Sequence, residues 1–122
     1  MKIFSYSGKG RKKSSVSKVK IFKGNGKLKI VGICMVRYFN NVYKIIINFL
    51  NKKFDIKVFV KGGGIKSKIK SVEFALSNVL LKIQPNYKKI IKEMNLISDS
   101  RKNERKKVGF VKSRKKKQFS KR

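Results

Sequence analysis

The side chains that ordinarily carry acid–base or metal chemistry are scarce in this chain of 122 residues. Histidine is absent, Cys34 is the one cysteine, and there are five acidic residues. A His-based triad or a histidine metal site therefore cannot form, and one cysteine cannot build a structural zinc site. No two carboxylates stand at a spacing that predicts an acid–base pair. We predict no enzyme activity, no catalytic residue, no metal site, no cofactor and no small-molecule substrate.

The chemistry that the sequence does offer is the binding of anions. Thirty-five Lys and Arg residues against five acids give a formal net charge of +30, and self-repulsion on this scale opposes compaction unless a polyanion is bound. Nucleic acid is the first expected partner, because phosphates and released counterions give basic proteins their affinity. An anionic membrane surface is the second. No apolar run approaches the roughly 18 residues of a membrane span. The predicted helices lie within a mixed α+β order, which argues against a membrane-active protein, so we predict no membrane partner.

A glycine triplet, Gly62–Gly64, stands between a predicted strand and a predicted helix. Such a loop can hold phosphate on its backbone N–H groups. However, "GGGIKS" is not a Walker motif, because Ile65 separates the last glycine from Lys66. The triplet is therefore interpreted either as a tight turn with positive φ or as a close approach to an RNA backbone, and the two interpretations are compatible.

Alternating apolar residues predict the strands that position these groups. Residues 14–22 and 27–32 alternate on either side of the "GNG" turn and predict a β-hairpin. Residues 54–61 carry apolar side chains on one face and predict a half-buried strand. On its polar face Phe59 is either exposed for stacking or, as is more common for phenylalanine, packed beneath a loop or helix.

Apolar residues at steps of three and four predict the helices. Residues 65–83 form a clear amphipathic pattern, Pro85 follows as a helix stop, and a shorter helix is predicted around residues 87–94. Residues 41–51 fit a strand by their three consecutive isoleucines and a helix by their spacing; we predict a helix that begins near Arg37. The order is then β-β-α-β-α-α, a two-layer α+β domain.

Charge and periodicity divide the chain into three parts. Residues 1–13 carry five cations and no acid, and we interpret them as a basic N-terminal arm. Residues 14–98 contain the periodic elements and form the predicted globular RNA-binding domain. Residues 99–122 carry twelve cations and two acids and lack periodicity, so they predict a long extended basic C-terminal tail. Aromatic residues between these terminal cations, such as Phe119, are suited to stacking on exposed bases.

Five segments of the chain resemble, in the same order, the sequence motifs of a known protein family. They are "YSGKGRKKSSVSKVKIFKGNGKLKIVG", "YF" at residues 38–39, "FDIKVFVKGGGI", "DSRKNERKKVG" and the ending "SRKKKQFSKR". Over nearly its whole length the chain resembles the bacterial-type ribosomal protein nine of the small (30S) subunit. The resemblance implies a two-layer α+β domain seated on small-subunit ribosomal RNA in the head. It also implies a structural role in translation, in the cytoplasmic ribosome of a bacterium or the ribosome of an organelle.

The resemblance also implies contacts for individual residues. The ending would touch the anticodon stem-loop of the peptidyl-site transfer RNA through Ser120, Lys121 and Arg122. Contact with ribosomal RNA is implied for Gly8, Lys9, Arg11, Lys12, Lys13, Gly62, Gly63, Gly64, Arg105, Lys106 and Lys107. To these we add, as cations that neutralise phosphates, Lys66, Arg114, Lys115, Lys116 and Lys117. Neighbouring proteins of the small-subunit head are the remaining implied partners.

The chain departs from the family pattern at Glu73 and Phe74, where the family helix usually carries Arg-His. Lys66, Lys68 and Lys70 supply charge nearby, although lysine does not reproduce the bidentate geometry of arginine. The residues leave one alternative function open, a general basic nucleic-acid-binding protein of the nucleoid or RNA-chaperone type. That function needs only charge and explains neither the glycine triplet nor the specific ending.

Overall fold

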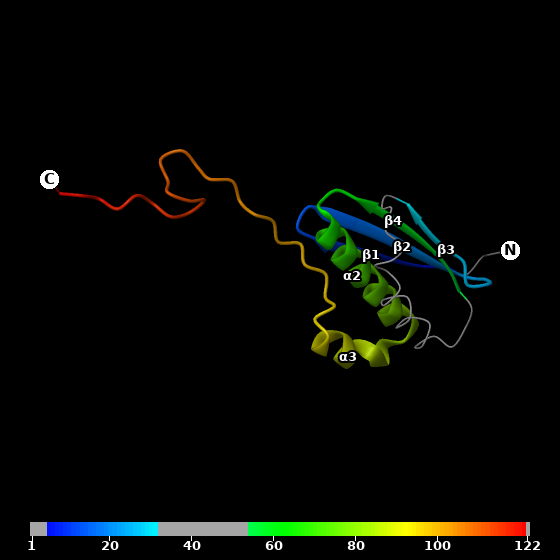
Figure 1. Ribbon diagram of the computed structural model, residues 1–122. Helices are drawn as coiled ribbons and strands as arrows, with labels where there is room; N and C mark the ends of the chain where they lie inside the picture. Colours follow the sequence, from blue (N-terminus) through cyan, green and yellow to red (C-terminus); the bar gives the residue numbers. More distant parts are fainter. Residues whose placement is uncertain (1–4, 32–53, 122) are drawn as a thin grey trace.

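The computed structural model describes residues 5–31 and 54–121 as one four-stranded sheet, two α-helices and an extended tail. The sheet has the order β1-β2-β4-β3. Its strands are β1 (Ser5–Lys12), β2 (Ser15–Lys23), β3 (Leu28–Val31) and β4 (Phe54–Lys61). Helix α2 (Ile65–Ile83) crosses one face of the sheet and is followed by the 3-10 turn η1 (Pro85–Tyr87) and helix α3 (Lys88–Glu93) (Figure 1). The predicted two-layer α+β class is confirmed.

The core lies between α2 and the inner face of the sheet. Its fully buried members are alternate residues of β2 and β4, such as Val19, Ile21 and Val58, and residues of α2 such as Val72 and Val79. The apolar spacing that predicted the long helix is the spacing that packs against these strands. That helix has the predicted bounds, and α3 falls within the predicted residues 87–94.

Strand β1 was not predicted. Residues 1–13 were interpreted as an arm, whereas Ser5–Lys12 form the edge strand of the sheet, antiparallel to β2. Its inward position Gly10 lies directly beneath α2, where a Cβ atom would collide with the carbonyl oxygen of Ser71 and the backbone nitrogen of Ala75. Glycine therefore allows the helix to approach the strand closely, and it also removes the apolar alternation by which a strand is recognised.

The predicted hairpin is wrong in its pairing, although both of its strands exist. β2 pairs antiparallel with β1 and β4, and β3 pairs parallel with β4, so β4 separates the two expected partners. The "GNG" turn is held instead by Asp55, whose Oδ1 accepts hydrogen bonds of 2.9–3.1 Å from the N–H groups of residues 25–27. The Lys27 N–H contributes most to lowering the pKa of this carboxyl group. The turn therefore directs the chain away from β2 and leaves space for β4.

Some predictions lie outside the described residues, and others concern the tail. The helix predicted for residues 41–51, with its start near Arg37, and also Cys34 lie outside the described residues. The described residues 99–121 contain no helix and no named strand, and one isolated bridge joins Phe110 and Lys116. Figure 1 shows this segment leaving the domain as an extended tail. Within residues 5–31 and 54–121, no helix has the length and apolarity that a membrane span needs.

Candidate nucleic-acid interface

Three loops meet at one end of the sheet (Figure 1). They are the β1–β2 turn (residues 12–14), the glycine loop with the start of α2 (residues 62–66) and the start of the tail (residues 99–102). We call them the basic loop cluster. Gly62 and Gly63 have φ of 74° and 73°, as a tight glycine turn requires. Gly62 lies against the carbonyl oxygen of Ser14, and a Cβ atom on Gly63 would come within 2.9 Å of the Ser15 Cβ.

The start of α2 is exposed, and it lacks the capping side chain and the acidic residue that commonly occur in the first turn of a helix. Gly64 is the N-cap, no side chain caps the helix, and its first turn contains no acidic residue. A Cβ atom on Gly64 would have nothing within 4 Å, and Ile65 and Lys66 are exposed. The N-terminal end of a helix carries a partial positive charge, so a lysine in the first turn is unfavourable there unless an anion is present. The arrangement is suited to binding a phosphate group on the unpaired N–H groups and on Lys66.

Asp99 attaches the tail to the edge strand of the sheet. Its Oδ2 lies 2.8 Å from Nζ of Lys12, and its Oδ1 accepts a hydrogen bond of 3.1 Å from Nε of Arg101. The backbone adds two bonds of 3.0 Å, because Asp99 N–H donates to the Arg11 carbonyl and Arg11 N–H donates to Oγ of Ser98. These bonds close the free edge of β1 at this end. The tail therefore starts at a fixed position beside the β1–β2 turn.

Because of these contacts, we expect Asp99 to titrate below the ordinary aspartate range. The Arg101 guanidinium, and after it the Lys12 ammonium, lowers the pKa of this carboxyl group. A lowered folded-state pKa means that the ionised form stabilises the attachment above the unfolded pKa of about 3.9 and that this stabilisation is lost as the pH falls through the folded value. In an NMR titration, the Asp99 carboxyl carbon of the full chain should have a lower midpoint than in a peptide of residues 95–103. Equal midpoints would show that the attachment does not form.

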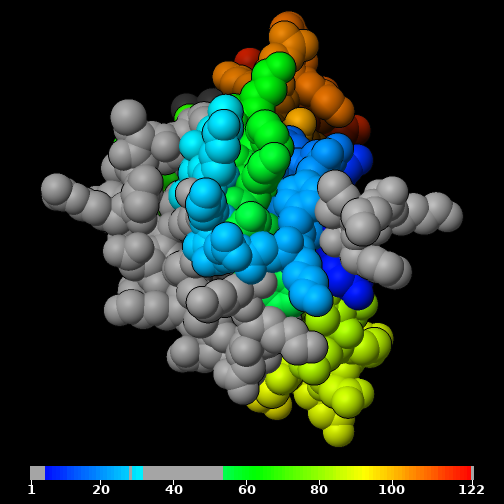
Figure 2. Space-filling model, turned by 90° about the vertical axis from the view of Figure 1, so that its right-hand side faces the viewer, coloured from blue at the N-terminus to red at the C-terminus, as the bar shows by residue number. Residues whose placement is uncertain are grey.

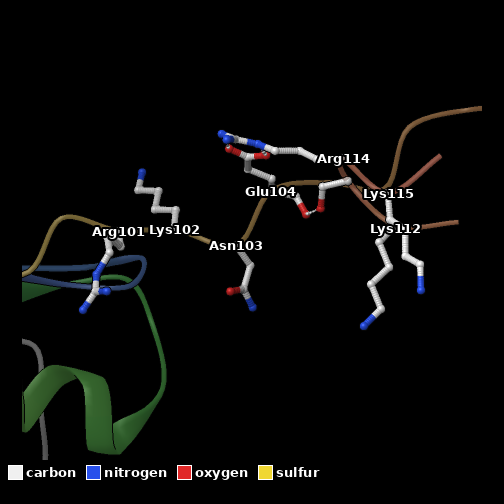
Figure 3. A pocket seen from close by; sticks show the side chains of 8 residues that line it. Arg101, Lys102, Asn103, Glu104, Lys112, Arg114 and Lys115 are labelled. Atoms are coloured by element: carbon white, nitrogen blue, oxygen red, sulfur yellow. Dashed lines mark hydrogen bonds and ion pairs between the residues drawn. The ribbon is translucent and has the colours of Figure 1, made fainter. Parts of the chain in front are cut away.

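A second ion pair shapes the tail farther from the domain (Figure 3). Arg114 engages Glu104 through both Nε and Nη2, with the Nε–Oε2 distance at 2.8 Å. Oγ of Ser113 donates to the Glu104 carbonyl at 3.0 Å, and Val111 N–H donates to the Lys115 carbonyl at 2.8 Å. The pair lowers the pKa of Glu104 and raises that of Arg114. The tail thus contains a folded-back turn, and the Arg114 charge is engaged within the chain.

The structure places the predicted RNA-binding residues in separate surroundings. The basic loop cluster holds Lys12, Lys13, Gly62, Gly63, Gly64 and Lys66. Lys9 and Arg11 are exposed on β1, whereas Gly8 is buried beneath α2. The predicted cations of the tail are all exposed: Arg105, Lys106, Lys107, Arg114, Lys115, Lys116 and Lys117. Ser120 and Lys121 are exposed near the end, and Arg122 lies outside the described residues. The contacts of all these residues with RNA stay predictions.

The departure from the family pattern on α2 is accommodated within the protein. Phe74 is 4% exposed, so its side chain belongs to the interior and does not face a ligand. Glu73 lies 2.6 Å from Nζ of Lys70 and forms an ion pair on the helix surface. Sequence reasoning did not find the attachment by Asp99 and Arg101. Asp99 is an isolated acid in a basic segment, and that isolation is the signal that could have identified it.

Comparison with known proteins gives a consistent result. The sequence pattern of the family described as "Ribosomal protein S9/S16" matches residues 10–122. The chain is 35% identical to the small ribosomal subunit protein uS9 of Lawsonia intracellularis, over 98% of this chain and 97% of the relative. It is also 35% identical to uS9 of Mycoplasmopsis pulmonis, over 97% of this chain and 93% of the relative. Identity with uS9c of Cyanidium caldarium is 36%, over 98% of this chain and all of the relative.

These matches extend over almost the full length of the chain and include the glycine triplet, the basic loop cluster and the tail. The relatives are small-subunit proteins of bacterial and organellar kinds, in agreement with the expected ribosome of a bacterium or an organelle. A structural role in the small ribosomal subunit follows. The chain belongs to the ribosomal protein S9/S16 family.

Proposed function

We propose that the chain binds small-subunit ribosomal RNA through the basic loop cluster and the tail, and that the end of the tail reaches the peptidyl-site transfer RNA. The observation that carries the proposal is the composition of the basic loop cluster. Its one carboxylate, Asp99, is already engaged by Lys12 and Arg101, while Lys13 and Lys66 are exposed beside the uncapped start of α2. A phosphate backbone supplies the missing negative charge.

The tail carries further cations that can bind phosphate groups at a distance from the domain. At about 3.3 Å per extended residue, its 24 residues can span on the order of 80 Å. Exposed cations occur along its length, in residues 105–107 and 115–117. We propose that these cations neutralise ribosomal RNA phosphates, with neighbouring head proteins alongside. Ser120, Lys121 and Arg122 then contact the transfer RNA. Gly8 is omitted from the contacts because it is buried beneath α2.

Deletion of residues 118–122 tests the proposed role of the tail end. Incorporation into small subunits should be unchanged, since the domain and the basic loop cluster remain. Affinity of those subunits for transfer RNA at the peptidyl site should fall several-fold. The logarithmic salt dependence of that binding should decrease by about one unit for each of the two cations lost. Filter binding of transfer RNA to purified subunits at several salt concentrations gives both quantities.

The matched control is the double variant Lys88→Gln/Lys89→Gln, which removes two exposed cations from α3. It should leave transfer-RNA binding as in the unmodified chain. Unchanged peptidyl-site affinity in the deletion variant, or an equal decrease in the control, would exclude the role of residues 120–122.

A further inference from the structure

The outer face of the sheet, opposite α2, carries an unusual concentration of lysine. Figure 2 shows β2, β4 and β3 side by side at the surface of the molecule. Strand register brings cations directly opposite one another: Lys9 pairs with Lys18, Lys20 with Lys57, and Lys57 with Lys29. Like charges in such pairs destabilise a sheet. We call this surface the lysine face, and define it by Lys9, Arg11, Val16, Lys18, Lys20, Lys29, Val31, Lys57, Phe59 and Lys61.

Acidic residues do not balance this charge within the described sheet. Asp55 is the one acid in the four strands, and its Oδ1 is engaged by the N–H groups of residues 25–27. Lys57 has a partial partner, since its Nζ lies 5.3 Å from the centre of the Phe22 ring. The face is therefore complementary in charge to a polyanion.

An exposed aromatic ring lies within these cations. Phe59 is 45% exposed, so the expected packing beneath a loop or helix is wrong. Its cross-strand neighbours are Lys18 on β2 and Val31 on β3, and a hollow beside it is lined by residues that include Val16 and Lys61. An aromatic surface bordered by ammonium groups is the arrangement that binds unpaired nucleotides, with the base on the ring and the phosphates on the cations.

We propose that the lysine face binds a single-stranded segment of ribosomal RNA, with one unpaired base stacked on Phe59 and its flanking phosphates on Lys18 and Lys61. This inference rests on the proposed function, because it adds a second RNA contact on the sheet to that of the basic loop cluster. The lysine face adjoins the basic loop cluster at Lys61 and Gly62, but no residue belongs to both surfaces, so variants can separate them.

The test uses the full chain and deproteinised small-subunit ribosomal RNA from its source. The chain contains no tryptophan, so the variant Phe59→Trp carries a single indole, whose emission is quenched when a base stacks on it. We expect strong quenching on titration with the RNA. Phe59→Leu, which retains apolar area without a ring, should weaken binding about 5- to 150-fold. Phe59→Tyr should retain the affinity. Met94→Trp, at an exposed position beside α3 and outside both surfaces, is the control and should remain unquenched.

The outcomes separate the two proposals. Failure of the unmodified chain to bind this RNA would overturn the proposed function and this inference together. Normal RNA binding with an unquenched indole and an unaffected Phe59→Leu variant would overturn the inference alone. Shielding of the indole in assembled small subunits, but not by deproteinised RNA, would show that a neighbouring protein covers the lysine face and would also overturn it.

Discussion

Raising the salt concentration from about 50 to about 200 mM will weaken binding of the full chain to small-subunit ribosomal RNA by about 10³–10⁵-fold, the change expected for 6–10 phosphate contacts. Without Lys18 and Lys61 of the lysine face, twelve cations are proposed to contact ribosomal RNA, but Lys12 is paired with Asp99 and Arg114 with Glu104. Ten remain. Each phosphate contact releases condensed counterions, and added salt reduces the gain from that release. Filter binding over a series of salt concentrations measures the slope.

A matched pair of variants connects this slope to the basic loop cluster. Lys13→Gln/Lys66→Gln removes two exposed cations from the cluster and should reduce the slope by about two. Lys88→Gln/Lys89→Gln removes the same charge from α3 and should leave the slope unchanged. A general nucleoid-type protein would instead show equal slopes for the two variants and comparable affinity for random DNA at raised salt. Either result would contradict the proposed site.

The substitution Gly10→Ala will destabilise the domain by about 3 kcal/mol or more, at or above the upper end of the usual cost of overpacking. The new Cβ atom would collide with backbone atoms, the Ser71 carbonyl oxygen and the Ala75 nitrogen. Ser71 is itself fixed, because its carbonyl accepts a 2.5 Å hydrogen bond from Oγ of Ser17 and its Oγ lies 3.1 Å from that of Ser15. The helix therefore cannot give way locally. Urea unfolding in phosphate buffer, where anions reduce the self-repulsion, measures the difference in the free energy of unfolding.

Gly64→Ala is the control for this prediction. Gly64 has a φ of −83° and open space where a Cβ atom would stand, so alanine requires neither strain nor displacement. Glycine ranks well above alanine at an N-cap, so this substitution costs about 0.5–1 kcal/mol, part of which the less flexible unfolded chain offsets. If Gly10→Ala is as stable as Gly64→Ala, the close packing of α2 on β1 is not a stabilising feature of the domain.

The helices and strands that were predicted correctly from the sequence are those whose apolar side chains form the core. Helix α2 was placed from Ile65 to Ile83, and β4 from Phe54 to Lys61, because their periodic side chains form the core. Strand β1 was missed for a physical reason: its inward positions Gly8 and Gly10 have no side chains to repeat. The strand is stabilised by the close approach of its backbone to α2, and the hydrophobic pattern of the sequence does not reveal such an approach.

The pairing of the strands could not be predicted either, because an alternating pattern shows which face of a strand is buried but not which strand lies beside it. The carboxylate of Asp55, 28 residues or more along the chain from the turn it holds, decides the path of the "GNG" segment. In the candidate site, too, features made by neighbouring residues were predicted and contacts between distant residues were not. The glycine loop and its lysine were predicted locally, whereas the attachment of the tail through Lys12, Asp99 and Arg101 joins residues 87 positions apart and required the structure.

The most direct test of the central claim is a cryo-EM map of the small ribosomal subunit that contains this chain. The account predicts RNA phosphates within hydrogen-bonding distance of Lys13, Lys66 and the N–H groups at the start of α2. It also predicts that the tail leads to the peptidyl site. A map in which the basic loop cluster faces solvent, with RNA on another surface of the domain, would contradict it.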